Sequence, residues 1–418
     1  FRKHPRLIVE ADGCYYLTKD GRRVFDSLSG LWCCGAGHNR PEIQQAVAKQ
    51  LGTLDYSPGF QFAHPLSFQL AERIVQLTPS GLDHVFFTNS GSESTDTALK
   101  IARAYWREIG RPAKTKLIGR IKGYHGVNFG GTSLGGIGPN RKQYGPLIDT
   151  DHLPSTLLAS NAFSRGMPEC GAHLADNLEE LIALHDASNI AAVIVEPLSG
   201  SAGVIVPPRG YLARLREICT KHDILLIFDE VITGFGRMGA TSGAEAFGVV
   251  PDMMTIAKQL TNGALPMGGV IVQSNIFEAF MASSAPEHAV ELPHGYTYSA
   301  HPVACAAALA ALDVFEQEAF VQRVRALAPP FEDQLHTFKG SPNVVDVRNY
   351  GLAGAIQIAP RDGDPLVRPY EIGLAMFESG HYVRWGGDTL QFAPPFVCDA
   401  AEISTLFERL HEVMETIA

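Results

Sequence analysis

ILLIFDEVITGFGR occupies residues 224–237, and the interpretation of the rest of the chain starts from it. Its apolar part is too short for an ordinary helix and ends on the carboxylates Asp229 and Glu230, before the first of two glycines. This pattern is typical of a buried parallel strand that carries an acid at its carboxyl end. A second apolar run, MMTIA at residues 253–257, ends in the same way on Lys258. An acid and an amine therefore follow two successive strands.

The acid and the amine suit one kind of chemistry. Burial disfavours the ammonium form of a lysine, so the neutral amine becomes a nucleophile that forms a Schiff base with a carbonyl group. A carboxylate across the same site can hold a proton on a heteroaromatic nitrogen, as aspartate does for pyridoxal phosphate (PLP). A buried structural salt bridge between Asp229 and Lys258 explains the same pattern, because neither charge is buried cheaply alone. This stretch does not decide between the two.

A candidate phosphate site lies earlier in the chain. VFFT at residues 85–88 predicts a strand, NSGSES at 89–94 a small polar turn, and the following residues an amphipathic helix. The backbone amides of such a turn, with the hydroxyls of Ser90 and Ser92, can bind a phosphate at the positive end of the helix. A plain helix cap is the alternative, since Ser and Asn favour helix starts without any ligand.

Two further predicted strands end on residues that can belong to the same site. KLIGRI at 116–121 precedes Tyr124 and His125, aromatic groups that either stack on a flat ring or pack in the core. IAAVIV at 190–195 precedes Glu196. Strands and helices alternate from 85 to 272, which predicts a doubly wound, mostly parallel sheet. Ligands of such sheets gather at the carboxyl ends of the strands, so these residues are expected on one rim.

Five motifs, in this order, resemble the signatures of the class III (omega) aminotransferases: SGSES at 90–94, YHG at 124–126, VEP at 195–197, DEVITGFGR at 229–237 and AKQLTNG at 257–263. The resemblance implies an α/β chain of PLP fold type I, the fold of aspartate aminotransferase. It implies a large domain with a mostly parallel sheet and a smaller α+β domain built from both termini. The expected bounds are 1–45 and 318–418 for the small domain and 46–317 for the large PLP-binding domain.

The resemblance also implies roles for particular residues. Lys258 and Asp229 are the expected catalytic pair: Lys258 holds the cofactor as an imine and moves a proton, and Asp229 keeps the pyridine nitrogen protonated. Thr297 is expected to reach the phosphate of the other subunit's cofactor, and no metal is expected. The cofactor-binding set is Ser90, Gly91, Ser92, Tyr124, His125, Glu196, Asp229, Val231, Lys258 and Thr297.

The same resemblance implies a substrate pocket formed by Leu31, Trp32, Phe60 and Arg384. Without it, Trp32 is better explained as a core residue, because tryptophan is usually mostly buried. Arg384 is predicted to end the strand HYVR at 381–384 and to bind the substrate carboxylate, since a guanidinium pairs with a carboxylate through two hydrogen bonds. A solvent-exposed arginine at a strand end is the alternative.

AKQLTNG, NAFSRG at 161–166 and GGDTLQFAPPF at 386–396 are similar to the beta-alanine:pyruvate, or omega-amino acid:pyruvate, subgroup of the family. The implied reaction moves an amino group from an omega-amino acid such as beta-alanine, or from an amine, to pyruvate. The products are alanine and an aldehyde or ketone, malonate semialdehyde for beta-alanine. Alternatives are taurine or gamma-aminobutyrate aminotransferase, dialkylglycine decarboxylase, an aminomutase and a silent PLP-binding protein.

Composition limits the partners. The net charge of −10 argues against nucleic acid or an anionic membrane as a partner, and no apolar run has the length of a membrane span. The seven cysteines are odd in number and lack metal spacing, which favours reduced thiols in a cytoplasmic protein. The expected assembly is a homodimer or homotetramer with active sites at the dimer interface. The sequence begins with Phe1 rather than Met, so it does not decide targeting.

Overall fold

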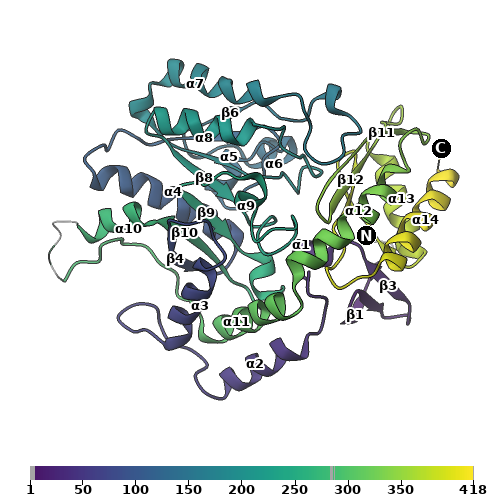
Figure 1. The fold of residues 1–418 in the computed structure, drawn as a ribbon, viewed down its shortest axis with the longest axis horizontal. Helices are drawn as coiled ribbons and strands as arrows, with labels where there is room; N and C mark the ends of the chain where they lie inside the picture. The colour runs from purple at the N-terminus through teal and green to yellow at the C-terminus, as the bar shows by residue number, and fades with distance from the viewer. Residues whose placement is uncertain (1–4, 283–285, 287, 418) are drawn as a thin grey trace.

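The computed structural model describes residues 5–282, 286 and 288–417, which form a larger and a smaller region side by side (Figure 1). The larger region contains a seven-stranded sheet of order β4-β10-β9-β8-β7-β5-β6. β10 pairs antiparallel with β4 and β9, and the other pairings are parallel, which confirms the predicted mostly parallel sheet. Its strands are β4 (Leu82–Thr88), β5 (Lys116–Arg120), β6 (Thr150–Leu153), β7 (Ile190–Val195), β8 (Leu225–Asp229), β9 (Met253–Ile256) and β10 (Gly268–Gln273).

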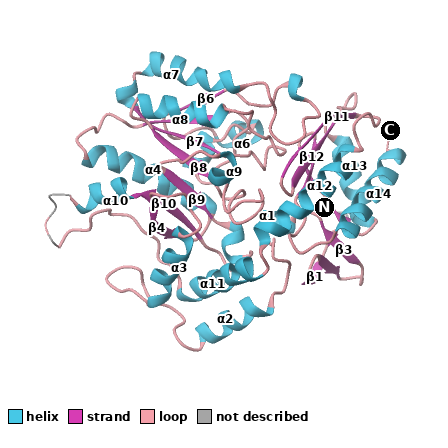
Figure 2. Cartoon of the chain, in the orientation of Figure 1, coloured by secondary structure: helices cyan, strands magenta, loops and turns pink. Residues whose placement is uncertain are grey.

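Helices cover both faces of this sheet (Figure 2). Successive side chains of a strand point to opposite faces, so in β8 Leu226 and Phe228 pack in the cluster that includes Leu215 of α8, while Ile227 packs with Leu99 of α4. Both faces are therefore apolar, as expected for buried parallel strands. The helices of this region are α2 (Pro41–Leu51), α3 (Pro65–Val75), α4 (Gly91–Glu108), α5 (Phe129–Leu134), α6 (Gly138–Tyr144), α7 (Asn177–His185), α8 (Tyr211–Lys221), α9 (Gly243–Phe247), α10 (Ser274–Met281) and α11 (Pro302–Gln317).

The smaller region contains two four-stranded sheets, β1-β2-β3-β13 and β11-β12-β15-β14. The N-terminal strand β3 pairs parallel with β13 near the C-terminus, so both ends of the chain build one sheet, and Figure 1 places both chain ends in this region. The elements are β1 (Ile8–Asp12), β2 (Tyr15–Thr18), β3 (Arg23–Asp26), β11 (Val344–Tyr350), β12 (Ala353–Ile358), β13 (His381–Tyr382), β14 (Arg384–Gly386), β15 (Thr389–Phe392), α12 (Phe320–His336), α13 (Val367–Glu378) and α14 (Ala400–Thr416).

The prediction that Arg384 ends a continuous strand at 381–384 is wrong. The strand is interrupted at Val383, whose side chain is fully buried. β13 before it pairs with β3, and β14 after it pairs with β15. The chain passes from one sheet to the other at this residue, so Arg384 begins a strand instead of ending one.

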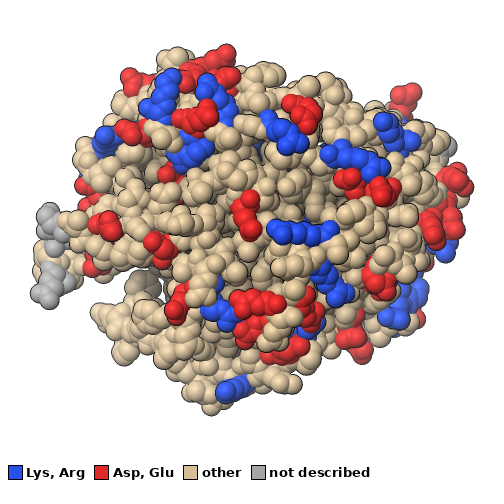
Figure 3. Space-filling view, in the orientation of Figure 1, with Lys and Arg blue, Asp and Glu red and all other residues tan. Residues whose placement is uncertain are grey.

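The surface agrees with the composition. Acidic and basic side chains are interspersed over the face drawn in Figure 3 and do not gather in one patch. Among the described residues, no helix combines the length and the apolar character that crossing a membrane requires.

Candidate active site

The carboxyl ends of the parallel strands bring the candidate residues to one cavity of about 400 Å³. Asp229 is the last residue of β8, Glu196 directly follows β7, and Lys258 begins the short 3-10 helix after β9. Ten of the predicted residues line this cavity: Leu31, Ser90, Gly91, Ser92, Tyr124, His125, Glu196, Asp229, Val231 and Lys258.

Asp229 is held in place by three neighbours and is 5% exposed. Its Oδ2 lies 2.8 Å from Nδ1 of the buried His125, and its Oδ1 accepts hydrogen bonds from the Thr255 hydroxyl and the Val231 amide, both at 3.2 Å. A carboxylate with this many partners keeps a fixed orientation. Asp229 can therefore present its carboxyl group in a fixed direction to a group bound in the cavity.

Lys258 is partly buried in the same cavity, and its φ of 40° lies in the left-handed region that non-glycine residues rarely adopt. Burial lowers the pKa of its amine, while the charges of Asp229 and Glu196 oppose that shift. A lowered pKa increases the fraction of neutral amine, which is the nucleophilic form.

Glu196 is 4% exposed, and its carboxylate ties two loops together. It accepts hydrogen bonds from the Tyr124 amide at 2.9 Å and from the Gly200 amide at 3.2 Å. Burial raises the pKa of Glu196 to about 7. The side chain fixes the loop that carries Tyr124 and is poised to change charge near neutral pH.

The turn before α4 is both a helix cap and a concave surface. Ser90 is the N-cap, and its Oγ accepts from the Glu93 amide at 3.2 Å, so the predicted cap is present. A Cβ added to Gly91 would lie 3.0 Å from both γ-carbons of Val231, and one added to Gly126 would lie 2.5 Å from the Ser92 hydroxyl. The two glycines keep the positive end of α4 open toward the cavity.

A second cavity, of about 560 Å³, adjoins the first and shares Leu31, Tyr124 and Lys258 with it. Trp32 and Arg384 line this second cavity. Trp32 is 3% exposed and therefore serves both as core and as a wall of the cavity. Within the described part of the chain, the buried Nε of Arg384 has no hydrogen-bond partner, so its guanidinium retains a free donor.

Phe60 and Thr297 lie apart from these two cavities. Phe60 is 49% exposed and lines a different cavity, where a Cβ on Gly295 would touch its ring. Thr297 is exposed, and its backbone carbonyl accepts a hydrogen bond from the Tyr56 hydroxyl at 3.0 Å. Their expected roles need a second copy of the chain and remain predictions.

Sequence reasoning missed Thr255 and Cys33. Thr255 is opposite Asp229 in the β8–β9 register, and this pairing explains their hydrogen bond. The apolar pattern of the two strands does not reveal such a register. Cys33 lines the first cavity with Lys258, and its position directly after Leu31 and Trp32 was the available signal.

Comparison with known proteins gives a consistent result along the whole chain. Residues 2–414 match the family Aminotransferase class-III. The chain is 65% identical to a beta-alanine–pyruvate aminotransferase of Pseudomonas aeruginosa, covering 100% of this chain and 94% of that protein. It is 64% identical to an omega-amino acid–pyruvate aminotransferase of Pseudomonas putida, covering 100% of this chain and 93% of that protein.

Solved structures agree. An amine transaminase from an uncultivated Pseudomonas species, solved in its PLP-bound form, matches with a TM-score of 0.93 at 36% identity and covers 100% of this chain and 96% of that chain. A family match over almost all residues, two relatives above 60% identity and the same fold lead to one conclusion. The chain belongs to the class III aminotransferases.

Proposed function

We propose that this chain is a PLP-dependent aminotransferase that moves the amino group of an omega-amino acid, such as beta-alanine, to pyruvate. The products are alanine and, from beta-alanine, malonate semialdehyde. The observation that carries the proposal is the placement of an amine, Lys258, and a fixed acid, Asp229, in one cavity beside the start of α4. The substrate names of the two most similar relatives described above support the choice of donor and acceptor.

The residues of the first cavity fit PLP. A volume of about 400 Å³ lies within the range of small-molecule sites, roughly 300–1,000 Å³. The open helix start, with the Ser90 and Ser92 hydroxyls, suits a phosphate. Tyr124 and Val231 provide an aromatic and an aliphatic wall for a flat ring, and Asp229 provides the acid for its nitrogen.

When bound, PLP supplies an electron sink for the pair released when the donor's C–H bond breaks. The chain supplies the remaining functions. Nζ of Lys258 would hold the cofactor, and its free amine would be the base that takes the proton from the donor carbon and the acid that gives it back. Asp229 holds a proton on the ring nitrogen, while His125 and Thr255 keep its carboxylate oriented.

Arg384 is proposed to bind the carboxylate of the donor and of pyruvate in the second cavity. A guanidinium offers parallel donors that match both oxygens of a carboxylate. Leu31 and Trp32 give that cavity an apolar wall, which excludes water from the reacting atoms.

A homodimer or homotetramer is proposed as the assembly, acting in the cytoplasm. The loop before α3, α3 itself and the segment before α11 carry large exposed apolar side chains: Phe60 at 49% and Phe62 at 68% in the loop, Phe68 at 66% in α3, and Tyr298 at 59% before α11. Apolar surface of this kind favours a protein interface. A second copy that covers it would carry Phe60 and Thr297 toward a neighbouring active site.

Steady-state assays test the proposal. Beta-alanine, gamma-aminobutyrate and taurine are each supplied with pyruvate, and alanine is measured. Beta-alanine is expected to give alanine, and carbon dioxide is measured with gamma-aminobutyrate and with a 2,2-dialkylglycine, because malonate semialdehyde is a 3-oxo acid that loses carbon dioxide by itself. Carbon dioxide released from the dialkylglycine in proportion to alanine would favour a dialkylglycine decarboxylase, and no alanine from any of the three donors would refute the substrate assignment.

A further inference from the structure

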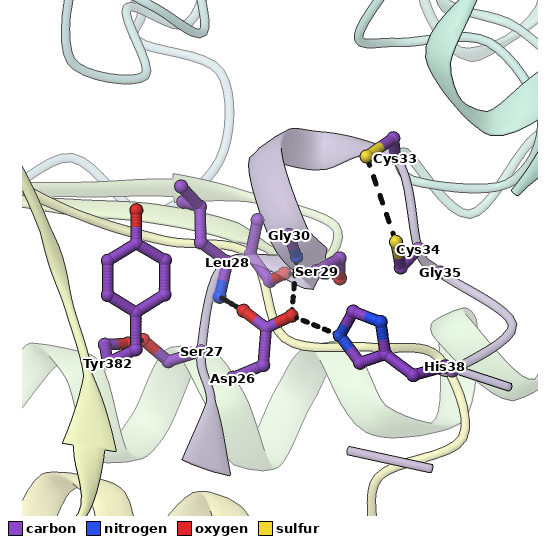
Figure 4. Close-up of polar contacts among 12 residues, drawn as sticks. Asp26, Ser27, Leu28, Ser29, Gly30, Cys33, Cys34, Gly35, His38 and Tyr382 are labelled. Carbon is purple, nitrogen blue, oxygen red and sulfur yellow. Dashed lines mark hydrogen bonds and ion pairs between the residues drawn. The ribbon is translucent and has the colours of Figure 1, made fainter. Parts of the chain in front are cut away.

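Two neighbouring cysteines, Cys33 and Cys34, lie beside the first cavity and have no part in the proposed reaction. Their sulfur atoms are 3.7 Å apart, and Cys33 lines the cavity together with Lys258. Figure 4 shows the pair directly after the short turn α1 (Ser29–Trp32).

Backbone and side-chain contacts hold the pair in this position. The Ser29 carbonyl accepts hydrogen bonds from the amides of both cysteines, each at 2.9 Å. Asp26 fixes the start of the turn, because its carboxylate accepts from the Leu28 and Gly30 amides and contacts the His38 ring (Figure 4). The two sulfurs are thus set by an anchored backbone.

Glycines flank the sulfur atoms. A Cβ added to Gly30 would lie 3.2 Å from the Cys34 sulfur and 3.3 Å from the Cys33 sulfur, and one added to Gly263 would lie 3.1 Å from both. Both glycines have positive φ values, 67° and 72°. Larger residues at either position would crowd the pair, so the surrounding backbone leaves both sulfurs room to react.

The pair differs from the other thiols in its electrostatics. Its shared hydrogen bond lowers the pKa of Cys33 and raises the pKa of Cys34, and the nearby Lys258 also favours a Cys33 thiolate. Burial instead raises the pKa of Cys219, Cys305 and Cys398 to about 12. Cys33 is therefore the stronger nucleophile, because the thiolate is the reactive form.

The geometry suits a bridging atom better than a disulfide. Adjacent Cα atoms lie about 3.8 Å apart, which is closer than the roughly 4.4–6.8 Å of ordinary disulfides. Two sulfurs bound to one tetrahedral centre at about 2.3 Å each stand about 3.8 Å apart, and a pyramidal trivalent centre, whose bond angles are narrower, requires the two sulfurs to approach somewhat closer than the 3.7 Å observed. One atom can therefore bond to both sulfurs with little movement of the chain.

The number of ligands selects the kind of atom. Zinc in a structural site takes four protein ligands, and no group of three or more His, Cys, Asp or Glu that could hold a metal exists among the described residues. An organic trivalent arsenic compound needs only two sulfurs, because its third bond is to carbon. We propose that Cys33 and Cys34 form a bidentate binding site for monosubstituted trivalent arsenicals beside the active-site cavity.

The binding step is balanced without an oxidant or reductant. The Cys33 and Cys34 sulfurs each form one bond to arsenic, and both bonds from arsenic to oxygen break. The two thiol protons leave with that oxygen as one molecule of water, and arsenic remains trivalent.

The experiment uses the full chain and phenylarsine oxide, with intact-protein mass spectrometry as the readout. The native chain is expected to gain the mass of one phenylarsine oxide less one water, which is one phenylarsenic group in place of two thiol hydrogens. A dithiol, 2,3-dimercaptopropanol, is expected to remove it, and a monothiol such as glutathione is not. Cys33→Ser and Cys34→Ser each leave a single bond, so retention of the adduct should weaken by about 10²–10⁴-fold.

Cys170→Ser is the matched control, because Cys170 is an exposed thiol, and this variant should bind like the native chain. Circular dichroism and the thermal midpoint establish that each variant folds, and mapping by iodoacetamide in the native chain should show Cys33 and Cys34 protected after treatment. Equal retention by both single variants, or loss of the adduct in Cys170→Ser alone, would overturn the proposal. The readout is a mass, so its failure leaves the proposed aminotransferase reaction untouched.

Discussion

The cavity around Lys258 and the loop around Phe60 differ in whether their residues are buried and bonded within a single chain. In the cavity, Asp229 and Glu196 are nearly fully buried and hydrogen-bonded to residues of the same chain. Phe60 in the loop and Thr297 in the segment before α11 are exposed and lie apart from the proposed site. The fold of a single chain therefore organises the proposed chemistry, while the roles proposed for Phe60 and Thr297 require a second copy. The following predictions test that contrast, from the largest effect to the smallest.

Lys258→Ala should have the largest effect. It removes the only amine proposed to attach the cofactor and to move the proton, so kcat for alanine formation should fall by about 10³-fold or more. Lys49→Ala on α2 is the control, since Lys49 is an exposed lysine outside the site and its loss should leave kcat unchanged. A Lys258→Ala protein that keeps more than a tenth of the native kcat would contradict the mechanism.

Glu196→Gln should change how stability depends on pH. The pKa of Glu196 is raised from 4.5 to about 7 in the folded state, so the unfolded chain loses this proton first as pH rises. The resulting destabilisation is absent below pH 4.5, grows between 4.5 and 7, and stays near 3 kcal/mol above pH 7.

Glutamine does not ionise, so the variant lacks this pH-dependent destabilisation. Urea unfolding of the cofactor-free protein gives the unfolding free energy of each form. The value for the variant minus the value for the native chain should increase by about 3 kcal/mol between pH 4.5 and 7. A constant difference across that interval would mean that Glu196 keeps an ordinary pKa in the folded chain.

Arg384→Ala should reduce activity with donors that carry a carboxylate more than activity with donors that lack one. A charged hydrogen bond contributes about 1.5–3 kcal/mol, so kcat/KM for beta-alanine should fall about 10–150-fold. An arylalkyl amine without a carboxylate should lose little as donor, and it serves as the internal control. Equal losses for both donors would mean that Arg384 acts on the structure of the cavity and not on the carboxylate.

Thr297→Val should have the smallest effect and depends on assembly. A hydrogen bond to the charged phosphate contributes at least about 1.5 kcal/mol, and Thr297 is an exposed donor that would share the phosphate with the start of α4, so this lower value applies and the Kd for PLP should rise about 10-fold. Thr405→Val on α14 is the control, since Thr405 is exposed in the smaller region. Sedimentation measurements at each protein concentration give the oligomeric state of both variants. An unchanged Kd in the associated variant would remove Thr297 from the phosphate site.

The sequence predicts the central sheet well because its strands are short apolar runs that end on charged residues. Three apolar runs end at Glu196, Asp229 and Lys258 and need burial on both faces, and the structure forms them as the strands β7, β8 and β9. The family resemblance then supplied the cofactor and the substrate class. Both kinds of inference depend on local patterns, which a single sequence contains.

Features that depend on pairing across the chain were not predictable. The contact between Thr255 and Asp229 follows from the register of two strands, which the pattern of either strand does not determine. The interruption at Val383 follows from the meeting of two sheets. Cys33 was signalled only by its place directly after Leu31 and Trp32, because its position in the cavity follows from the turn that Asp26 anchors.

The crossing of the chain at Val383 couples two distant parts of the protein. One residue, Val383, separates Arg384 from β13, which is paired with β3 of the N-terminal β2–β3 hairpin. A rotation of that hairpin would be transmitted along the backbone to the guanidinium. Fusing a rigid tag to the first strand would thus be an indirect way to alter donor selectivity while leaving every residue of the reaction centre intact.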